Sequence, residues 1–245
     1  MPALPEGFTA LAPVPGPKTY DLYAIGTGRP VILVHEMTGV TPETLRLARD
    51  LANEGFRVYL PVLFGDFPQP DGLAPKLRAI AHVCLSREFH LLSTGQTSPV
   101  THWLKNVTQW VAAQHPERKV GLIGMCLTGG FVLVMMLALQ AGAVVVCQPT
   151  IPLALTGRAR RSYGLSVRDV AAAQAHRPAL PILGLRYARD VICPRERLEQ
   201  VRTDFPQAQV IHLPGGSGPV SHATLTEQRS AQAVQLVFSF LNQHL

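Results

Sequence analysis

The stretch that most constrains the fold is KVGLIGMCLTGG, residues 119–130, in which a short apolar strand enters a glycine-punctuated turn and then an apolar helix, FVLVMMLALQ. A strand that turns this sharply into a helix places the central side chain of the turn, here Cys126, above the carboxyl end of the sheet. This is the geometry of a nucleophile elbow. The following helix directs free backbone N–H groups at the thiol, which favours a thiolate and an oxyanion beside it.

The turn departs from the G-x-S-x-G pattern of such elbows at one position. Gly124 and Cys126 occupy the first glycine and the nucleophile positions, but Thr128 occupies the second glycine position. Because glycine allows the sharpest turns, we expect the elbow to relax or bulge at Thr128. A buried structural cysteine is the alternative interpretation of Cys126, since free cysteines are among the most buried residues.

Length and composition fit one globular α/β domain. The chain has 245 residues, 47% hydrophobic and 16% charged, so we expect a single domain over residues 1–245 with a proline-rich lead at residues 1–19. The net charge of +6 comes without a dense basic run beyond residues 158–161, so we predict no nucleic-acid partner. Positive charge around a pocket favours a small anionic substrate instead.

The cysteines and the N-terminus bear on compartment and on metal binding. The four cysteines, Cys84, Cys126, Cys147 and Cys193, show no C-x-x-C spacing. We therefore predict neither a zinc site nor a redox dithiol. The N-terminus lacks the basic start and apolar run of a signal peptide, so we expect a cytoplasmic protein. Residues 120–157 carry no charge, but their most apolar part, residues 131–147, is shorter than the ~20 residues of a membrane span. A buried helix followed by a buried strand accounts for the same composition.

Apolar strands alternate with amphipathic helices along the chain, which predicts a mainly parallel sheet with helices on both faces. The first strand should be an edge strand or an arm of a hairpin. We expect strands at residues 19–25, 30–36, 57–64, 120–123, 143–148, 181–188 and 209–213. We expect helices at residues 41–55, 77–92, 101–114, 131–140, 167–174, 193–201 and about 224–241.

Four reactive side chains follow the carboxyl ends of predicted strands, where open parallel sheets bind their ligands. They are Glu36, Cys126, Asp190 and His222. Nucleophile, acid and histidine come in the chain order of an α/β-hydrolase triad. Asp204 is a rival acid, but it follows a helix, where a triad acid is not expected.

Four segments carry a resemblance to a known family: VHEMTGV at residues 34–40, GMCLTGG at 124–130, RYARDVICP at 186–194 and GSGPVSH ending at His222. In these segments the chain resembles the dienelactone hydrolase family of α/β-hydrolases, and the similarity extends from about residue 20 onward. The resemblance implies the α/β-hydrolase fold.

The resemblance also implies a role for each site residue. Cys126 resembles the family nucleophile, His222 its base, Asp190 the acid that orients the base, and Glu36 the acid that contacts the resting thiol. The backbone N–H groups at the oxyanion hole correspond to those of Met37 and Leu127. The family mechanism requires no metal and no organic cofactor. Dienelactone-specific members have an arginine four residues after the histidine, where this chain has Thr226, which leaves the substrate open.

The sequence thus predicts a cysteine-nucleophile hydrolase of a small carboxylic ester, lactone or thioester, with no membrane partner. Two alternative hypotheses are a non-catalytic ligand-binding protein of the same fold and an acyl-transfer enzyme on the same triad. We also expect Glu36 to accept a hydrogen bond from a protonated Cys126 thiol. When two acidic groups lie side by side away from water, one of the two must hold a proton.

Overall fold

The sheet is built as the alternation of apolar segments predicts. A computed structural model describes the chain except for residues 1–3, 71, 86–98, 139, 152–155 and 216–220. Its sheet has eight strands in the order β1-β2-β4-β3-β5-β6-β7-β8. Pairing is antiparallel at β1/β2 and β2/β4 and parallel from β4 through β8. The strands are β1 (Thr9–Ala10), β2 (Asp21–Ile25), β3 (Arg29–Val34), β4 (Phe56–Val62), β5 (Val120–Met125), β6 (Ala141–Cys147), β7 (Ile182–Tyr187) and β8 (Ala208–Leu213).

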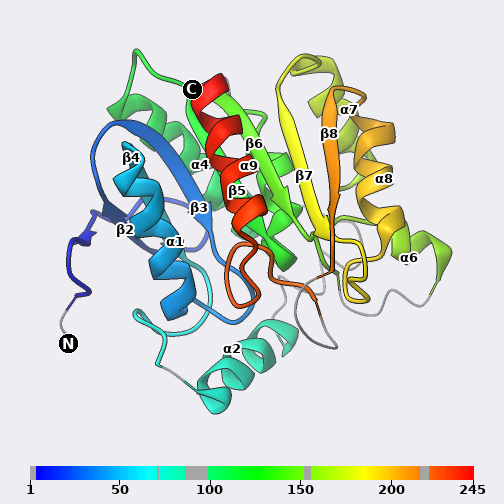
Figure 1. Cartoon of the computed structure of the whole chain (residues 1–245). Helices are drawn as coiled ribbons and strands as arrows, with labels where there is room; N and C mark the ends of the chain where they lie inside the picture. Colours follow the sequence, from blue (N-terminus) through cyan, green and yellow to red (C-terminus); the bar gives the residue numbers. More distant parts are fainter. Residues whose placement is uncertain (1–3, 71, 86–98, 139, 152–155, 216–220) are drawn as a thin grey trace.

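Helices cover both faces of this sheet, which confirms the predicted α/β-hydrolase architecture (Figure 1). They are α1 (Pro42–Asn53), α2 (Leu73–Leu85), α4 (Pro99–Gln114), α5 (Phe131–Met135), α6 (Gly157–Arg161), α7 (Val167–His176), α8 (Arg195–Asp204) and α9 (Ala231–His244). Side chains of β3 alternate between the two cores. Ile32 and Val34 pack with α4, α5 and α8, whereas Val31 and Leu33 pack with α1 and α9. The central strands therefore read as continuous apolar runs.

Helix α1 shows how local sequence sets an element's bounds. Thr41 is its N-cap, accepting a hydrogen bond from the backbone N–H of Thr44 at 3.3 Å, and Pro42 follows in the first turn. The helix ends before Gly55, which has a φ of 84° that favours glycine. The predicted helix at residues 41–55 is confirmed.

Four predicted elements differ from the structure. The helix after the elbow ends at Met135 rather than near residue 140, because the chain must turn back at once into β6, which begins at Ala141. The last helix begins at Ala231, where Ser230 caps it, rather than near residue 224. β1 pairs with β2 in antiparallel fashion, so the first predicted strand is second from the edge, which fits the predicted hairpin arm rather than the predicted edge strand. α2 starts four residues earlier than predicted, and residues 86–92 of that prediction lie outside the described residues.

Figure 1 shows α2 apart from the two helical layers, at the end of the molecule where the loops after the strands gather. Helix α2 thus lies by the carboxyl ends of the strands. None of the helices that the structure describes combines the length and apolar character that a membrane span requires. The uncharged stretch at residues 131–147 instead supplies α5 and the fully buried strand β6.

Candidate active site

Cys126 follows β5 in a backbone conformation that L-residues rarely adopt, with a φ of 56°. The turn that it opens, η1 (Cys126–Gly129), is a 3-10 turn that leads into α5. A Cβ on Gly124 would lie 2.5 Å from the backbone oxygen of Thr128, so only glycine fits beside this turn. The predicted strand, sharp turn and helix therefore bring Cys126 to the carboxyl end of the sheet, where it lines a cavity.

Thr128 is accommodated by hydrogen bonds rather than by a break in the elbow. Its buried hydroxyl accepts from the Met125 N–H at 3.1 Å. The same oxygen lies 2.9 Å from the carbonyl oxygen of Met125 and 3.1 Å from that of Val34, to one of which it donates. The side chain thus lies between the ends of β3 and β5, beneath Cys126. The relaxation expected at this position takes the form of the 3-10 turn.

Asp190 and His222 form a close pair next to this elbow. Asp190 Oδ2 accepts from His222 Nδ1 at 2.7 Å, and the Asp190 side chain is fully buried. Asp190 Oδ1 accepts from the backbone N–H groups of Ile192 at 2.8 Å and Cys193 at 2.9 Å. Because Nδ1 donates to the carboxylate, Nε2 is the ring nitrogen that remains to exchange a proton, and it lies 3.4 Å from the Thr150 hydroxyl oxygen.

The surroundings of His222 make it a strong base. Burial lowers the pKa of His222, but hydrogen bonds to Asp190 and Cys126 and the negative charges of both groups raise it to about 10. The rival acid Asp204 lies elsewhere, at the end of α8, where it accepts from the Tyr163 hydroxyl at 2.6 Å. The structure therefore places Asp190, and not Asp204, beside the histidine.

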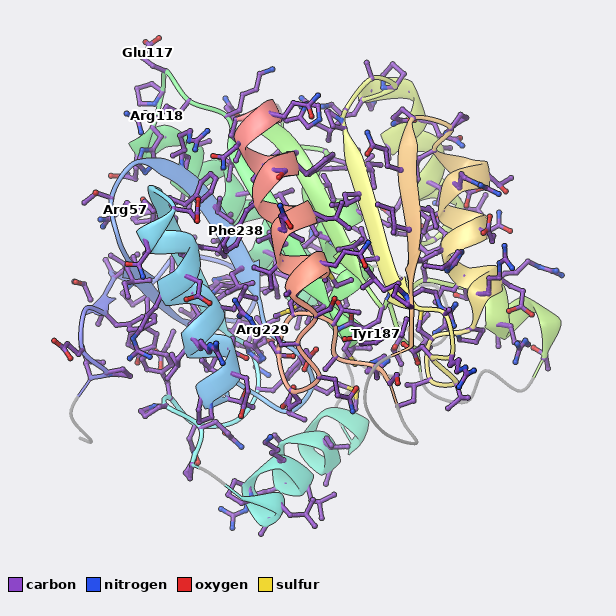
Figure 2. The ribbon with its side chains drawn as sticks, viewed as in Figure 1. Arg57, Glu117, Arg118, Tyr187, Arg229 and Phe238 are labelled. Atoms are coloured by element: carbon purple, nitrogen blue, oxygen red, sulfur yellow. The ribbon has the colours of Figure 1, made fainter. Side chains whose placement is uncertain are left out.

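The loop that carries His222 is anchored on both sides of the sheet end. Tyr187, at the end of β7, donates its hydroxyl to the backbone oxygen of Gln228. Arg229 pairs with Asp50 of α1 at a distance of 2.6 Å. Figure 2 shows Tyr187 and Arg229 at this end of the molecule, near the foot of α9. The loop is thereby fixed to β7 and to α1 at once.

Glu36 is buried just after β3, and its partners are not those that the sequence predicts. Gln148 Nε2 donates to Glu36 Oε1 at 3.0 Å, and the carboxyl of Glu36 also hydrogen-bonds to that of Glu227. Burial first, and then the charge of Glu227, raise the pKa of Glu36 to about 8. Glu36 thus holds a proton at neutral pH and donates it to Glu227. The predicted contact with the Cys126 thiol is not among the hydrogen bonds described for Glu36.

Sequence analysis missed Gln148 and Glu227. Gln148 follows β6 with a φ of 34°, and its Oε1 accepts from the Thr224 hydroxyl at 2.7 Å. It therefore links Glu36 to the loop of His222. A polar residue directly after an apolar strand was a usable signal for Gln148, since a buried polar group needs a partner. Nothing in the local sequence singles out Glu227.

Four of the candidate site residues line a cavity of about 790 Å³, within the range of small-molecule sites. Cys126, His222, Glu36 and Met37 all contribute to its wall, and Leu127 follows the nucleophile in the turn. In the part of the chain that the structure describes, no group of three or more His, Cys, Asp or Glu side chains is arranged to hold a metal ion.

The other cysteines differ from Cys126 in their surroundings. Cys147 and Cys193 are fully buried. Burial raises the pKa of the Cys147 thiol, and it raises the pKa of the Cys193 thiol to about 12. The side chain of Cys84 lies outside the described residues. Among the cysteines described, only Cys126 combines a cavity wall with a neighbouring base.

Comparisons with known proteins bear on the family and the fold. The sequence model of the dienelactone hydrolase family matches residues 23–245. No curated protein matches the chain. A proposed dienelactone hydrolase from Klebsiella pneumoniae subsp. pneumoniae MGH 78578 is 20% identical, with a TM-score of 0.64 over 97% of this chain and 99% of that one.

Two further solved structures share the fold at low identity. An esterase from Exiguobacterium antarcticum is 14% identical, with a TM-score of 0.58 over 94% of this chain and 98% of its own. A dienelactone hydrolase-like promiscuous phosphotriesterase from metagenomic libraries is 19% identical, with a TM-score of 0.56 over 95% of this chain and 98% of its own. At these identities the similarity speaks to the fold alone.

Proposed function

Because the chain belongs to the dienelactone hydrolase family, and is thereby a hydrolase of ester bonds, we propose that it cleaves a small carboxylic ester, lactone or thioester with Cys126 as nucleophile. The observation that carries this proposal is the alignment of Asp190, His222 and Cys126. The 2.7 Å hydrogen bond from His222 Nδ1 to Asp190 leaves Nε2 for the thiol, which lies in a strained elbow on the cavity wall.

In the first half of the reaction, His222 Nε2 holds the proton of the Cys126 thiol, which the raised pKa of the imidazole favours, and the thiolate Sγ attacks the carbonyl carbon of the substrate. The oxyanion that forms accepts hydrogen bonds from the backbone N–H groups of Met37 and Leu127. The bond from the carbonyl carbon to the leaving oxygen, or to the leaving sulfur of a thioester, then breaks, and His222 gives its proton to the departing atom. A thioester on Cys126 remains.

In the second half, His222 takes a proton from water, and the resulting hydroxide attacks the thioester carbonyl. Cys126 Sγ leaves with the electron pair and the carboxylic acid is released. Throughout, Asp190 holds the imidazole in its productive tautomer and stabilises the imidazolium. Neutral Glu36 adds no negative charge beside the thiolate, which a carboxylate at that depth would oppose. No metal or organic cofactor is needed for these steps.

A substrate panel with matched variants tests the proposal. Small esters, lactones and thioesters are offered to the wild type, to Cys126→Ala and to Cys147→Ala, a control that removes a buried thiol away from the cavity. We expect turnover by the wild type and the control but not by Cys126→Ala. A mass increment equal to the acyl group should appear on Cys126 when the reaction is stopped early.

Three outcomes would count against the proposal. Undiminished turnover by Cys126→Ala would show that Cys126 is not the nucleophile. Binding without turnover across the whole panel would favour a ligand-binding protein. A product yield that depends on an added alcohol or thiol acceptor rather than on water would favour an acyl-transfer enzyme on the same triad.

A further inference from the structure

The wall of the active-site cavity combines apolar side chains with four ionisable ones besides the catalytic histidine. The apolar part is contributed mainly by Ile80, Ile151, Val191, Ile192 and Pro194. The ionisable side chains are those of Glu36, which is neutral, and of Lys76, Arg160 and Glu227. Whether either cation is available to a substrate decides which esters the cavity accepts.

Lys76 reaches the cavity from α2 and is paired with Glu227. Its Nζ donates to Glu227 Oε1 at 3.1 Å, with about a quarter of each side chain exposed. Burial raises the pKa of Glu227, but its hydrogen bonds to Glu36 and Lys76 lower it overall, so this carboxyl is ionised at neutral pH. With Glu36 neutral, the group of three carries one positive and one negative charge. Lys76 is therefore occupied by a protein carboxylate.

Arg160, on α6, is paired in the same way. Its Nε and Nη2 donate to Glu196 Oε1 at 3.1 Å and 3.0 Å, and Nη2 also lies 3.1 Å from Oε2. Both side chains of this pair are 46% exposed, so water screens it more than the pair at Lys76. The lysine and the arginine of the described wall are thus both paired with carboxylates of the chain itself.

We propose that this cavity selects esters whose acyl group is uncharged and apolar, and that Glu227 is the residue that enforces the selection; this inference rests on the hydrolase function proposed above. A substrate carboxylate in the cavity would have to displace Glu227 from Lys76 and lie beside a second negative charge at close range. Binding of an alkyl chain in the cavity breaks no ion pair, and it buries apolar surface against the isoleucine and valine side chains. The anionic substrate expected from the net charge is thereby disfavoured.

The test compares two esters that differ only at the end of the acyl chain: p-nitrophenyl butyrate and p-nitrophenyl hemisuccinate, in which a carboxylate replaces the terminal methyl group. For the wild type we expect kcat/KM for butyrate to exceed that for hemisuccinate by at least ~10-fold. The reason is that repulsion between the substrate carboxylate and Glu227 at close range raises the free energy of the bound hemisuccinate by an amount that corresponds to at least that ratio. The preference should shrink as salt is added, since salt screens the repulsion.

Glu227→Gln releases Lys76 while keeping the shape of the side chain. We expect the ratio of kcat/KM for hemisuccinate to that for butyrate to rise by at least ~10-fold. Glu196→Gln is the matched control, because it releases Arg160 from the more exposed pair, and its ratio should rise less. A role of Glu227 in folding alone would lower both activities and leave the ratio unchanged.

Lys76→Met provides a second variant if Glu227→Gln does not fold. It leaves the carboxylate of Glu227 without its cation, so the ratio should fall below that of the wild type. A wild type that prefers hemisuccinate, with turnover that Cys126→Ala abolishes, would overturn the selectivity while leaving the hydrolase in place. Turnover that persists in Cys126→Ala would overturn the proposed function instead.

The comparison does not depend on turnover. Binding of the two intact esters to Cys126→Ala, followed by NMR titration, should favour butyrate, and the added Glu227→Gln change should reduce that preference. Equal affinity for both esters, unchanged by the added substitution, would refute the selectivity even in a protein that hydrolyses neither.

Discussion

Replacing Asp190 by asparagine tests the centre of the proposed mechanism with the least change in shape. The Asp190 carboxylate accepts three hydrogen bonds, two from backbone N–H groups to Oδ1 and one from His222 to Oδ2. Asparagine keeps an oxygen for the two backbone donors. Its NH₂ group, however, faces His222 Nδ1, which then has to accept, so that Nε2 carries the proton and cannot take one from Cys126.

The magnitude of the expected loss follows from this change of tautomer. In serine proteases the same acid-to-amide change lowers kcat by ~10⁴-fold, which corresponds to about 5.5 kcal/mol of transition-state stabilisation. We expect a loss of similar order in kcat/KM for Asp190→Asn. The fold should persist, because both backbone hydrogen bonds are retained. The pKa of His222 should fall from about 10, since the carboxylate that supports its imidazolium is gone.

The assay combines ester turnover, the pH dependence of His222 measured by NMR, and thermal unfolding. Asp204→Asn is the control, because this acid bonds to the Tyr163 hydroxyl and not to the histidine. It should cost stability but leave turnover within a few-fold of the wild type. If Asp204→Asn abolished turnover while a folded Asp190→Asn stayed within ~10-fold of the wild type, the assignment of the acid would be wrong.

Three further predictions follow from the same site. Brief iodoacetamide treatment should label Cys126 before any other cysteine, and mass mapping that finds another thiol first would contradict this. Glu36 binds a proton in the folded protein between its ordinary pKa of 4.5 and about 8, so rising pH lowers stability through that window, and Glu36→Gln should gain Tm relative to the wild type from about pH 5 to about pH 9. If the difference in Tm between Glu36→Gln and the wild type did not change with pH, Glu36 would not hold a proton in the folded protein. Thr128→Ala should lower the free energy of unfolding by about 1–3 kcal/mol in denaturant titrations, because the N–H of Met125 loses its hydroxyl partner; no loss would show that this hydrogen bond is dispensable.

Local patterns in the sequence were sufficient to predict most of the fold and the order of the proposed triad. Continuous apolar runs predicted buried parallel strands, and Thr41 with Pro42 predicted the start of α1. Gly124 and Cys126 predicted the elbow. Such features depend on the residues within one or two turns of the chain, so periodicity and capping rules detect them. These rules predict at which end of the sheet a side chain lies, but not which other side chains it contacts there.

The partners of the site residues were decided by tertiary structure alone. Glu36 and Glu227 stand far apart in the chain, yet the end of β3 and the loop before α9 bring their carboxyls into contact. Lys76 reaches Glu227 only because α2 lies across the strand ends. The net charge of +6 predicted an anionic substrate, whereas the pairing of the cavity cations favours a neutral one. Net charge is a sum over the whole chain, while the charge that a substrate meets depends on which groups the fold places within a few ångströms of each other.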